Sequence, residues 1–252
     1  MTITVITVTY NSEKTIRDTI ESVLRQSYQN VEYIIVDGAS EDSTMAVVGE
    51  YQRKFEGRLR FITEPDRGIY DAMNKGLKLA TGDVVGFLNS DDYFTTDDVL
   101  QSVAHVFESK EFDAIYGDVH YVSFKDTAKR TRYYSSRLFF RPLMRFGFMP
   151  AHPSFYCARS VYEAYGGFDP SYRIAADFEH LLRLIFIHRI RTKYIKKDFV
   201  TMRTGGLSNA GIASRIEIMK EHVRALKNNG VYSNYTLLCL RYFYKIYELI
   251  RR

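Results

Sequence analysis

Segments that predict β-strands alternate with segments that predict α-helices through the first 92 residues, and this alternation limits the folds open to the chain. Runs rich in β-branched and apolar residues predict strands at 3–9, 31–36, 60–62 and 84–88. Apolar residues at helical spacing predict helices that begin near Ser12, over 42–54 and over 69–80. This alternation of strands and helices predicts an α/β fold, with a mostly parallel sheet flanked by helices on both faces.

Polar and acidic residues follow each of these predicted strands. Ligands of a parallel sheet bind beyond the carboxyl ends of its strands, so these residues are candidates for contact with a nucleotide. The candidates are Thr9, Tyr10, Asn11, Asp37, Asp66, Arg67, Ser90, Asp91 and Asp92. Two usual nucleotide motifs are missing from the sequence: the first strand is not followed by G-x-G-x-x-G, and there is no phosphate loop ending in Gly-Lys-Ser or Gly-Lys-Thr.

The stretch Asn89-Ser90-Asp91-Asp92 follows the apolar run 84–88, which predicts a buried strand. Two adjacent carboxylates at the end of a buried strand are unfavourable unless a cation neutralises them, and such oxygen ligands suit Mg²⁺ or Mn²⁺. The alternative is a helix cap, because Asp and Ser are common between a strand and a helix. The sequence around this stretch favours the metal site, with Asp92 and Asp91 as its ligands.

Composition narrows the class of protein. The 252 residues permit one large domain or two small ones, and 46% hydrophobic residues support a full core. A net charge of +5 suits an anionic ligand or membrane surface but is too small to predict nucleic-acid binding. Cys157 and Cys239 lack a paired metal spacing, which favours a reducing compartment. The start of the chain predicts a strand and not a signal peptide, and no apolar run reaches membrane-spanning length, so we expect a cytoplasmic protein.

Together, these motifs resemble those of the family 2 inverting glycosyltransferases of the GT-A fold, in particular bacterial enzymes that build surface polysaccharides. The matching motifs are TVTYN at 7–11, SVLRQ at 22–26, DGAS at 37–40, DRGIYDAMNKG at 66–76, ATGD at 80–83 and the carboxylate stretch at 89–92. The resemblance implies a GT-A catalytic domain over 1–211, with a nucleotide-sugar half (1–92) and an acceptor half (93–211). Residues 212–252 are then a C-terminal helical extension.

The resemblance also implies roles for the candidate residues. Thr9 and Tyr10 flank the uridine of a UDP-sugar, and Asp37 contacts its base. Asn11, Asp66, Arg67 and Ser90 lie nearby in the same nucleotide-sugar site. Asp91 binds the ribose or the metal, and Asp92 is the direct ligand of Mn²⁺ or Mg²⁺ on the sugar nucleotide's diphosphate.

A candidate general base lies in the second half. Residues 174–184 predict a helix whose buried side is formed by leucines and isoleucine, and an Asp at its start is often only a cap. The resembled family has a Glu-Asp pair here, and its Asp is the catalytic base. Asp177 matches that Asp, whereas Ala176 replaces the usual Glu. We expect partial burial to raise the pKa of Asp177. Glu179 is a second candidate base, but its position on the helix points it elsewhere.

Three further features of the acceptor half carry alternatives. His152 is a substrate contact by resemblance or a structural residue. Arg203 lies in a predicted loop over 203–208. By resemblance it helps to neutralise the donor diphosphate, and the alternative is that the loop is an ordinary glycine turn. An arginine series meets the phosphates of a lipid-linked acceptor, or it is a solvated surface; its members are Arg130, Arg132, Arg137, Arg141 and Arg145.

The remaining elements are short strands and two late helices. Strands are predicted at 113–117, at 193–195, at 199–202, and in a hairpin of 120–124 with 130–134. A helix from about Ser214 has an apolar stripe of Ile216, Met219, Val223 and Leu226, and a second helix begins near Asn234. These helices either pack against the catalytic domain or a partner subunit, or lie on the inner face of a membrane.

The combined prediction is an inverting, metal-dependent glycosyltransferase. It moves a sugar from a nucleotide-sugar, with UDP-sugar preferred, to a hydroxyl of a saccharide or lipid-linked saccharide in polysaccharide biosynthesis. Two alternatives are a nucleotidyltransferase on a similar scaffold and a non-catalytic subunit that binds sugar nucleotides. The donor sugar, the acceptor and the linkage depend on pocket contacts that the sequence leaves open.

Overall fold

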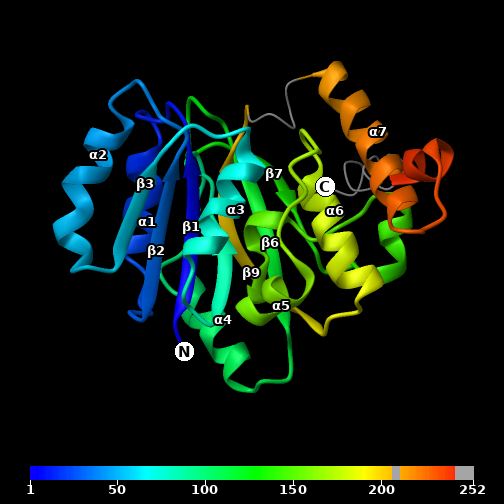
Figure 1. Cartoon of the computed structure of the whole chain (residues 1–252), viewed down its shortest axis with the longest axis horizontal. Helices are drawn as coiled ribbons and strands as arrows, with labels where there is room; N and C mark the ends of the chain where they lie inside the picture. Colours follow the sequence, from blue (N-terminus) through cyan, green and yellow to red (C-terminus); the bar gives the residue numbers. More distant parts are fainter. Residues whose placement is uncertain (206–210, 242–252) are drawn as a thin grey trace.

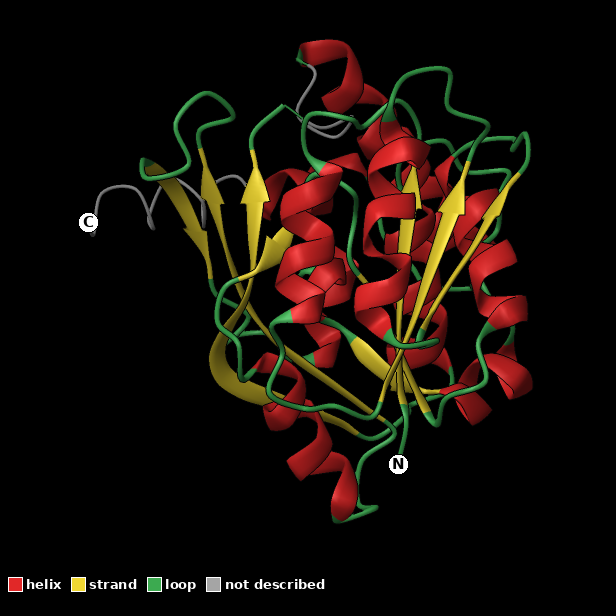
Figure 2. Ribbon diagram, turned by 90° about the vertical axis from the view of Figure 1, so that its left-hand side faces the viewer, coloured by secondary structure: helices red, strands yellow, loops and turns green. Residues whose placement is uncertain are grey.

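A nine-stranded sheet runs through the residues that the computed structural model describes, 1–205 and 211–241 (Figure 1). Its first half has the parallel strand order β3, β2, β1, β4. The bounds of these strands are β1 Ile3–Thr9, β2 Val31–Asp37, β3 Leu59–Thr63 and β4 Val84–Phe87. The helices between them are α1 Ile16–Leu24, α2 Thr44–Tyr51 with the 3-10 turn η1 Gln52–Phe55, and α3 Ile69–Leu79. In Figure 2 the arrowheads of the parallel strands point to one edge of the sheet.

The second half of the chain extends the same sheet through β8, β6, β9 and β5, with β7 paired on β6. Strand β8 is antiparallel to both β4 and β6, whereas β6 and β9 are parallel. The strands are β5 Tyr93–Phe94, β6 Ala114–Val122, β7 Arg130–Tyr134, β8 Tyr156–Ala158 and β9 Thr192–Arg203. The helices are α4 Val99–Glu108, η2 Arg141–Phe146, η3 His152–Ser154, α5 Arg159–Tyr165, α6 Ala176–Leu181 with its π-helical continuation η4 Leu182–Ile187, and α7 Ile212–Asn228. Residues 235–241 are also helical.

Two pairs of predicted short strands are in fact single long strands. Segments 113–117 and 120–124 join as β6, and segments 193–195 and 199–202 join as β9. In β9, the polar run Lys196-Lys197-Asp198 separates the two apolar segments, so the sequence predicts two strands there. Strands β6 and β9 keep pairing past it because their register shifts around Asp118, as at a β-bulge. The predicted hairpin of β6 with β7 is confirmed.

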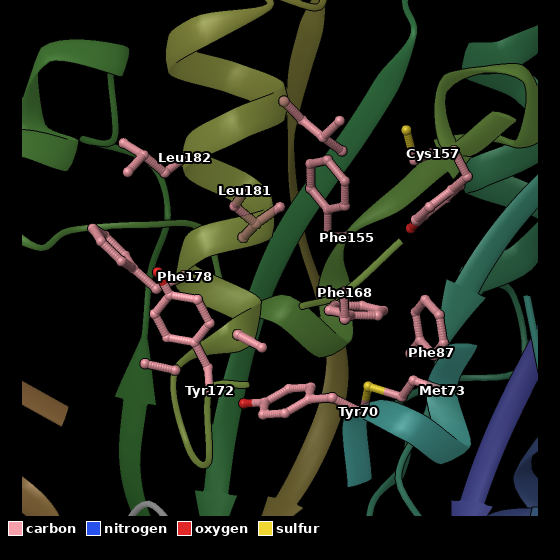
Figure 3. Packing of buried hydrophobic residues seen from close by; sticks show 14 of the residues in the cluster. Tyr70, Met73, Phe87, Phe155, Cys157, Phe168, Tyr172, Phe178, Leu181 and Leu182 are labelled. Carbon is pink, nitrogen blue, oxygen red and sulfur yellow. The ribbon is translucent and has the colours of Figure 1, made fainter. Parts of the chain in front are cut away.

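Two apolar clusters lie on opposite faces of the sheet because alternate strand residues point to opposite sides. Ile3 and Val5 of β1 belong to a cluster with helices α1, α2 and α4. Ile6 and Val8 belong to a cluster with α3, α5, α6 and α7. Figure 3 shows part of this second cluster, where the Phe168 ring packs against the rings of both Tyr70 and Phe87.

The described C-terminal helices pack on the preceding part of the chain, as in one of the predicted alternatives. Ala225 and Leu226 of α7, and Leu238 of the following helix, are buried in the same cluster as α6. Ile216 of the predicted stripe is instead 51% exposed. No helix in residues 1–205 and 211–241 combines the length and apolarity that a membrane crossing needs. Residues 206–210 of the predicted loop and 242–252 of the predicted last helix lie outside the described residues.

Two glycines make a matched test of this packing. A Cβ added at Gly86 of β4 would lie 2.2 Å from the buried Tyr156 ring, whereas one added at Gly49 of α2 would meet nothing within 4 Å. We expect Gly86→Ala to lower the free energy of unfolding by about 1–3 kcal/mol through overpacking. Gly49→Ala should raise it by about 0.4–1 kcal/mol. Urea unfolding measures both, and equal effects of the two substitutions would contradict the close approach at Gly86.

Candidate active site

Hydrogen bonds tie together the loops that follow β1, β2 and β4. The Asn11 N–H, at a left-handed φ of 49°, donates to Ser40 Oγ at 2.8 Å. Ser40 in turn donates its hydroxyl to Asp37 Oδ1 at 2.5 Å, and the hydroxyls of Ser12 and Ser90 lie 2.9 Å apart. Asp37 is fully buried, so the structure gives its carboxylate a role in shaping the turn. Its predicted contact with the nucleotide base stays a prediction.

The other residues predicted for the nucleotide site gather around Gly38. A Cβ at this position would lie 2.4 Å from Asp66 Oδ2 and 3.5 Å from the Tyr10 ring, so the absence of a side chain lets these residues converge. The Tyr10 ring is 59% exposed, and Arg67 is exposed beside Asp66. Thr9 Oγ1 is buried and has no hydrogen-bond partner among the described residues. The exposed Tyr10 ring and Arg67 guanidinium leave stacking and hydrogen-bonding groups open to a ligand at this edge of the sheet.

The carboxylate pair lies directly after β4. Asp92 is 1% exposed, and burial, followed by the charge of Asp91, raises its pKa well above the ordinary range. Burial also raises the pKa of Asp91. Asn89 Nδ2 donates to Asp92 Oδ2 at 3.3 Å, while the buried Asn89 Oδ1 has no hydrogen-bond partner in the described part of the chain. The end of β4 therefore places the desolvated carboxyl groups of Asp91 and Asp92 beside the Asn89 Oδ1, which is free to bind a ligand.

Arg203 compensates part of that charge, but from a different place than predicted. It ends strand β9 instead of lying in a loop, because β9 is one long strand. Its backbone N–H donates to Asp92 Oδ1 at 3.3 Å, and its guanidinium donates to the Asp91 carbonyl at 2.7 Å. The same buried guanidinium forms an ion pair with Asp18 of α1. Arg203 thus supports the carboxylate pair within the fold.

These residues fit a divalent metal. The oxygens of Asp91, Asp92 and Asn89 are hard ligands, and a cation would offset the burial that raises both carboxyl pKa values and the charge of Asp91 that further raises that of Asp92. The described residues contain no group of three or more His, Cys, Asp or Glu side chains that could hold a metal alone. Mg²⁺ is typically held by one or two carboxylates together with substrate phosphates and water, so a pair is sufficient.

Asp177 lies in the first turn of α6 and is half-buried. Burial raises its pKa to about 6, in the direction that the sequence analysis predicts. The Phe178 N–H donates to its Oδ1 at 2.8 Å, and the Tyr70 hydroxyl lies beside it; both lower the pKa. Glu179 faces away toward Arg183, at 3.2 Å. Asp177 is the better candidate for a general base, because an acid with a pKa near 6 is ionised at neutral pH yet still accepts a proton readily.

Tyr121 of β6, which the sequence analysis did not select, connects the two acidic sites. Burial raises the pKa of its hydroxyl, and the charges of Asp92 and Asp177 raise it further. The phenol is therefore near both carboxylates, one from the candidate metal ligands and one from the candidate base. The sequence signal for Tyr121 is weak, because it is one of 20 tyrosines on a strand predicted only from alternation.

Glu221 of α7 is a second residue that sequence reasoning missed. Its side chain is buried and accepts the backbone N–H groups of Arg173, Ile174 and Ala175 at 2.6, 2.9 and 2.8 Å. It thereby fixes the loop that leads into α6, and its charge contributes to the raised pKa of Asp177. The C-terminal extension thus positions the candidate base from 44 residues away, a link that no local motif reveals.

His152 packs within the apolar layer. It is 7% exposed, and its ring centroid lies 5.4 Å from those of both Phe87 and Phe168. Burial lowers its pKa to about 4, so the ring is neutral at neutral pH. This environment favours the structural alternative, and a direct contact of His152 with substrate stays a prediction.

Comparison with known proteins decides the family, because the model of Glycosyl transferase family 2 matches residues 4–165. The chain belongs to this family. It is 29% identical over 192 residues to a PGL/p-HBAD biosynthesis glycosyltransferase of Mycobacterium bovis, covering 75% of this chain and 72% of the relative. It is 26% identical over 253 residues to the Escherichia coli UDP-Glc:alpha-D-GlcNAc-diphosphoundecaprenol beta-1,3-glucosyltransferase WfaP, covering 99% and 94%.

Solved structures confirm the GT-A fold of this family 2 glycosyltransferase. S. aureus TarS 1-349 in complex with UDP-GlcNAc is similar with a TM-score of 0.67 at 18% identity, over 95% of this chain and 71% of that one. The mannosyltransferase PcManGT from Pyrobaculum calidifontis, in complex with GDP-Man and Mn²⁺, has a TM-score of 0.67 at 20% identity, over 90% and 63%. The chain spans 40% of a longer TarS structure.

The role of Glu221 in holding the loop before α6 is testable by stability. Glu221→Ala leaves three backbone N–H groups without their acceptor, and we expect it to lower the free energy of unfolding by about 3 kcal/mol. Glu217→Ala is the matched control on the same helix, because the Glu217 side chain is 41% exposed and, among the described residues, forms an ion pair only with Lys220, at 3.8 Å. Urea unfolding of both variants gives the comparison, and equal losses would rule out a special role for Glu221.

Proposed function

We propose that this protein is an inverting glycosyltransferase that moves a sugar from a UDP-sugar to a hydroxyl of a saccharide or lipid-linked saccharide. The observation that carries the proposal is that Asp92 and Asp177 are both near enough to Tyr121 for their charges to raise the pKa of its hydroxyl. One acidic site suits the departing diphosphate, and the other suits the incoming hydroxyl. Because the chain belongs to Glycosyl transferase family 2, the reaction that we propose for Asp92 and Asp177 is sugar transfer.

In the proposed reaction, Asp177 accepts the proton of an acceptor hydroxyl as that oxygen attacks the anomeric carbon. The new glycosidic bond forms on one face while the bond to the nucleoside diphosphate breaks on the opposite face, so the anomeric centre inverts. The buried environment of Asp177 holds its pKa near 6 and makes it a stronger base than an exposed Asp. Glu221 and Tyr70 keep the start of α6 in position.

The nucleotide lies, in this proposal, over the loops after β1, β2 and β3, against Tyr10, Asp66 and Arg67. Asp92 and Asp91 hold Mn²⁺ or Mg²⁺. When bound, the metal supplies Lewis-acid stabilisation of the leaving diphosphate. A neighbour solved with Mn²⁺ and another solved with UDP-GlcNAc support this assignment of metal and donor. WfaP, by its name, acts on a diphosphoundecaprenol-linked sugar, which supports a lipid-linked acceptor and action at the cytoplasmic face of a membrane.

The two alternative functions make different demands on this site. A non-catalytic subunit would not need a carboxyl group with a raised pKa at Asp177, near the site that binds the diphosphate. A nucleotidyltransferase would release diphosphate from a nucleoside triphosphate. Neither alternative gains support from an observation of its own, and both differ from sugar transfer in their products.

Donor binding tests the metal site. UDP, UDP-sugars and GDP-sugars are titrated calorimetrically with and without Mn²⁺ on the wild type, on Asp92→Asn and on the exposed control Asp97→Asn. We expect one UDP-sugar to bind in a Mn²⁺-dependent way, with an affinity lowered at least about tenfold in Asp92→Asn because a charged ligand is lost. Asp97→Asn should bind like the wild type. Metal-independent binding to the wild type would refute the assignment of Asp91 and Asp92.

The pH dependence tests the base. Transfer requires ionised Asp177, so kcat/KM should rise with pH through a midpoint near 6 and level off above it. An exposed Asp would place the midpoint near about 3.9. Asp177→Asn should lose about a hundred- to ten-thousand-fold in kcat. Glu179→Gln, which changes a carboxyl group two residues away, should keep the midpoint. A midpoint near 4 in the wild type would contradict Asp177 as the buried base.

A further inference from the structure

A pocket with an apolar wall and basic edges lies outside the site described so far. Its volume is about 810 Å³, within the usual range for small-molecule sites. The segment between β7 and η3 and the last described helix enclose it. Its apolar lining comes mainly from Leu138, Phe140, Leu143, Phe146, Phe148 and Leu240.

The apolar lining continues onto the surface. Leu138, Phe140 and Leu240 are 63%, 57% and 44% exposed, so the mouth of the pocket presents large apolar side chains to solvent. A hydrocarbon chain that entered the pocket would cover both its wall and this rim. Such coverage gains about 25 cal/mol for each Å² of apolar surface removed from water.

The polar groups of the pocket suit a phosphate. Arg132 and Arg137 line it, and neither forms an ion pair with any residue in 1–205 or 211–241. Ser136 also lines the pocket and is 2% exposed, and its buried Oγ has no hydrogen-bond partner in that same part of the chain. A buried hydroxyl without a partner is unfavourable, and a phosphate oxygen would satisfy it.

The pocket also adjoins the reaction centre. The Arg132 guanidinium lies 5.7 Å from the ring centroid of Tyr121 and 5.5 Å from that of Tyr134. Tyr121 pairs with Met202 of β9, the residue before Arg203, and the Arg203 N–H donates to Asp92. A phosphate at Arg132 would therefore lie one aromatic ring away from the end of β9 that contacts the carboxylate pair.

We propose that this pocket binds the phosphate-linked lipid end of the acceptor, with the phosphate at Arg132, Arg137 and Ser136 Oγ and the hydrocarbon chain along the apolar wall. The inference rests on the proposed function, and it names the acceptor class as a saccharide joined through phosphate to a lipid. A general attraction to an anionic membrane is the weaker explanation, because Ser136 Oγ is buried inside the pocket and Arg132 faces Tyr121.

The test uses the full-length chain and farnesyl diphosphate, a soluble molecule that combines a phosphate group with a hydrocarbon chain. Calorimetric titrations below its micelle concentration are run with saturating UDP and Mn²⁺, which block the donor site. Inorganic diphosphate and farnesol are titrated as the separate halves of the probe. We expect farnesyl diphosphate to bind at least about tenfold more tightly than either half, because charge and apolar contacts act together.

Variants then locate the site. Arg132→Gln should weaken farnesyl diphosphate binding about tenfold or more, and the conservative Ser136→Ala should weaken it several-fold. Arg53→Gln makes the same change in charge on an exposed residue of η1, at the opposite end of the sheet, and should bind like the wild type. Equal affinity in all of these proteins, or inorganic diphosphate binding as tightly as the whole probe, would overturn the inference.

Four further outcomes separate the explanations. If the wild type binds UDP with Mn²⁺ but not farnesyl diphosphate, this inference fails and the proposed function stands. If it binds farnesyl diphosphate but not UDP, the donor assignment fails and the pocket stands. Arginine-dependent binding to phosphatidylglycerol vesicles without farnesyl diphosphate binding would assign the surface to bulk lipid. Binding of the probe only after removal of residues 242–252 would assign the pocket to that segment, and either result would overturn the inference.

Discussion

The burial of two adjacent carboxyl groups at the end of β4 is the constraint on which the rest of the site depends. Asp92 is almost completely buried, so its negative charge is stable only with compensation. Within the protein, Asn89 and Arg203 supply part of that compensation, and Arg203 reaches the site because β9 crosses the sheet as one long strand. A bound cation would supply the rest of the compensation, and for this reason this edge of the sheet suits a metal together with a diphosphate.

The second half of the chain holds the candidate base, which the first half does not contain. Asp177 comes from α6, and the loop before α6 is held by Glu221 of α7 through three backbone hydrogen bonds. Stacking of Phe178 on His222, with ring centroids 3.9 Å apart, adds to this contact. The described part of the C-terminal extension therefore helps to hold the candidate base in place, although its sequence resembles an ordinary amphipathic helix.

Much of the fold was predictable because it follows from local patterns. Alternation of strands and helices, and a period of two along each strand, are enough to indicate a parallel sheet with two apolar faces. The site was partly predictable for the same reason, because parallel strands end at one edge. The long strands β6 and β9 were not predictable, since a bulge and a polar run interrupt their alternation. Arg203 was assigned to a loop for this reason.

By itself, the sequence determined the α/β class, the family motifs, the carboxylate pair after β4 and the identity of the candidate base. Tertiary structure alone decided that Tyr121 lies near both Asp92 and Asp177, that Glu221 supports α6, and that Arg132 and Ser136 share a pocket with exposed apolar side chains. The physical reason is sequence separation. Periodicity and turn chemistry act over a few residues, whereas the burial of charge and the sharing of hydrogen bonds join residues that only folding brings together.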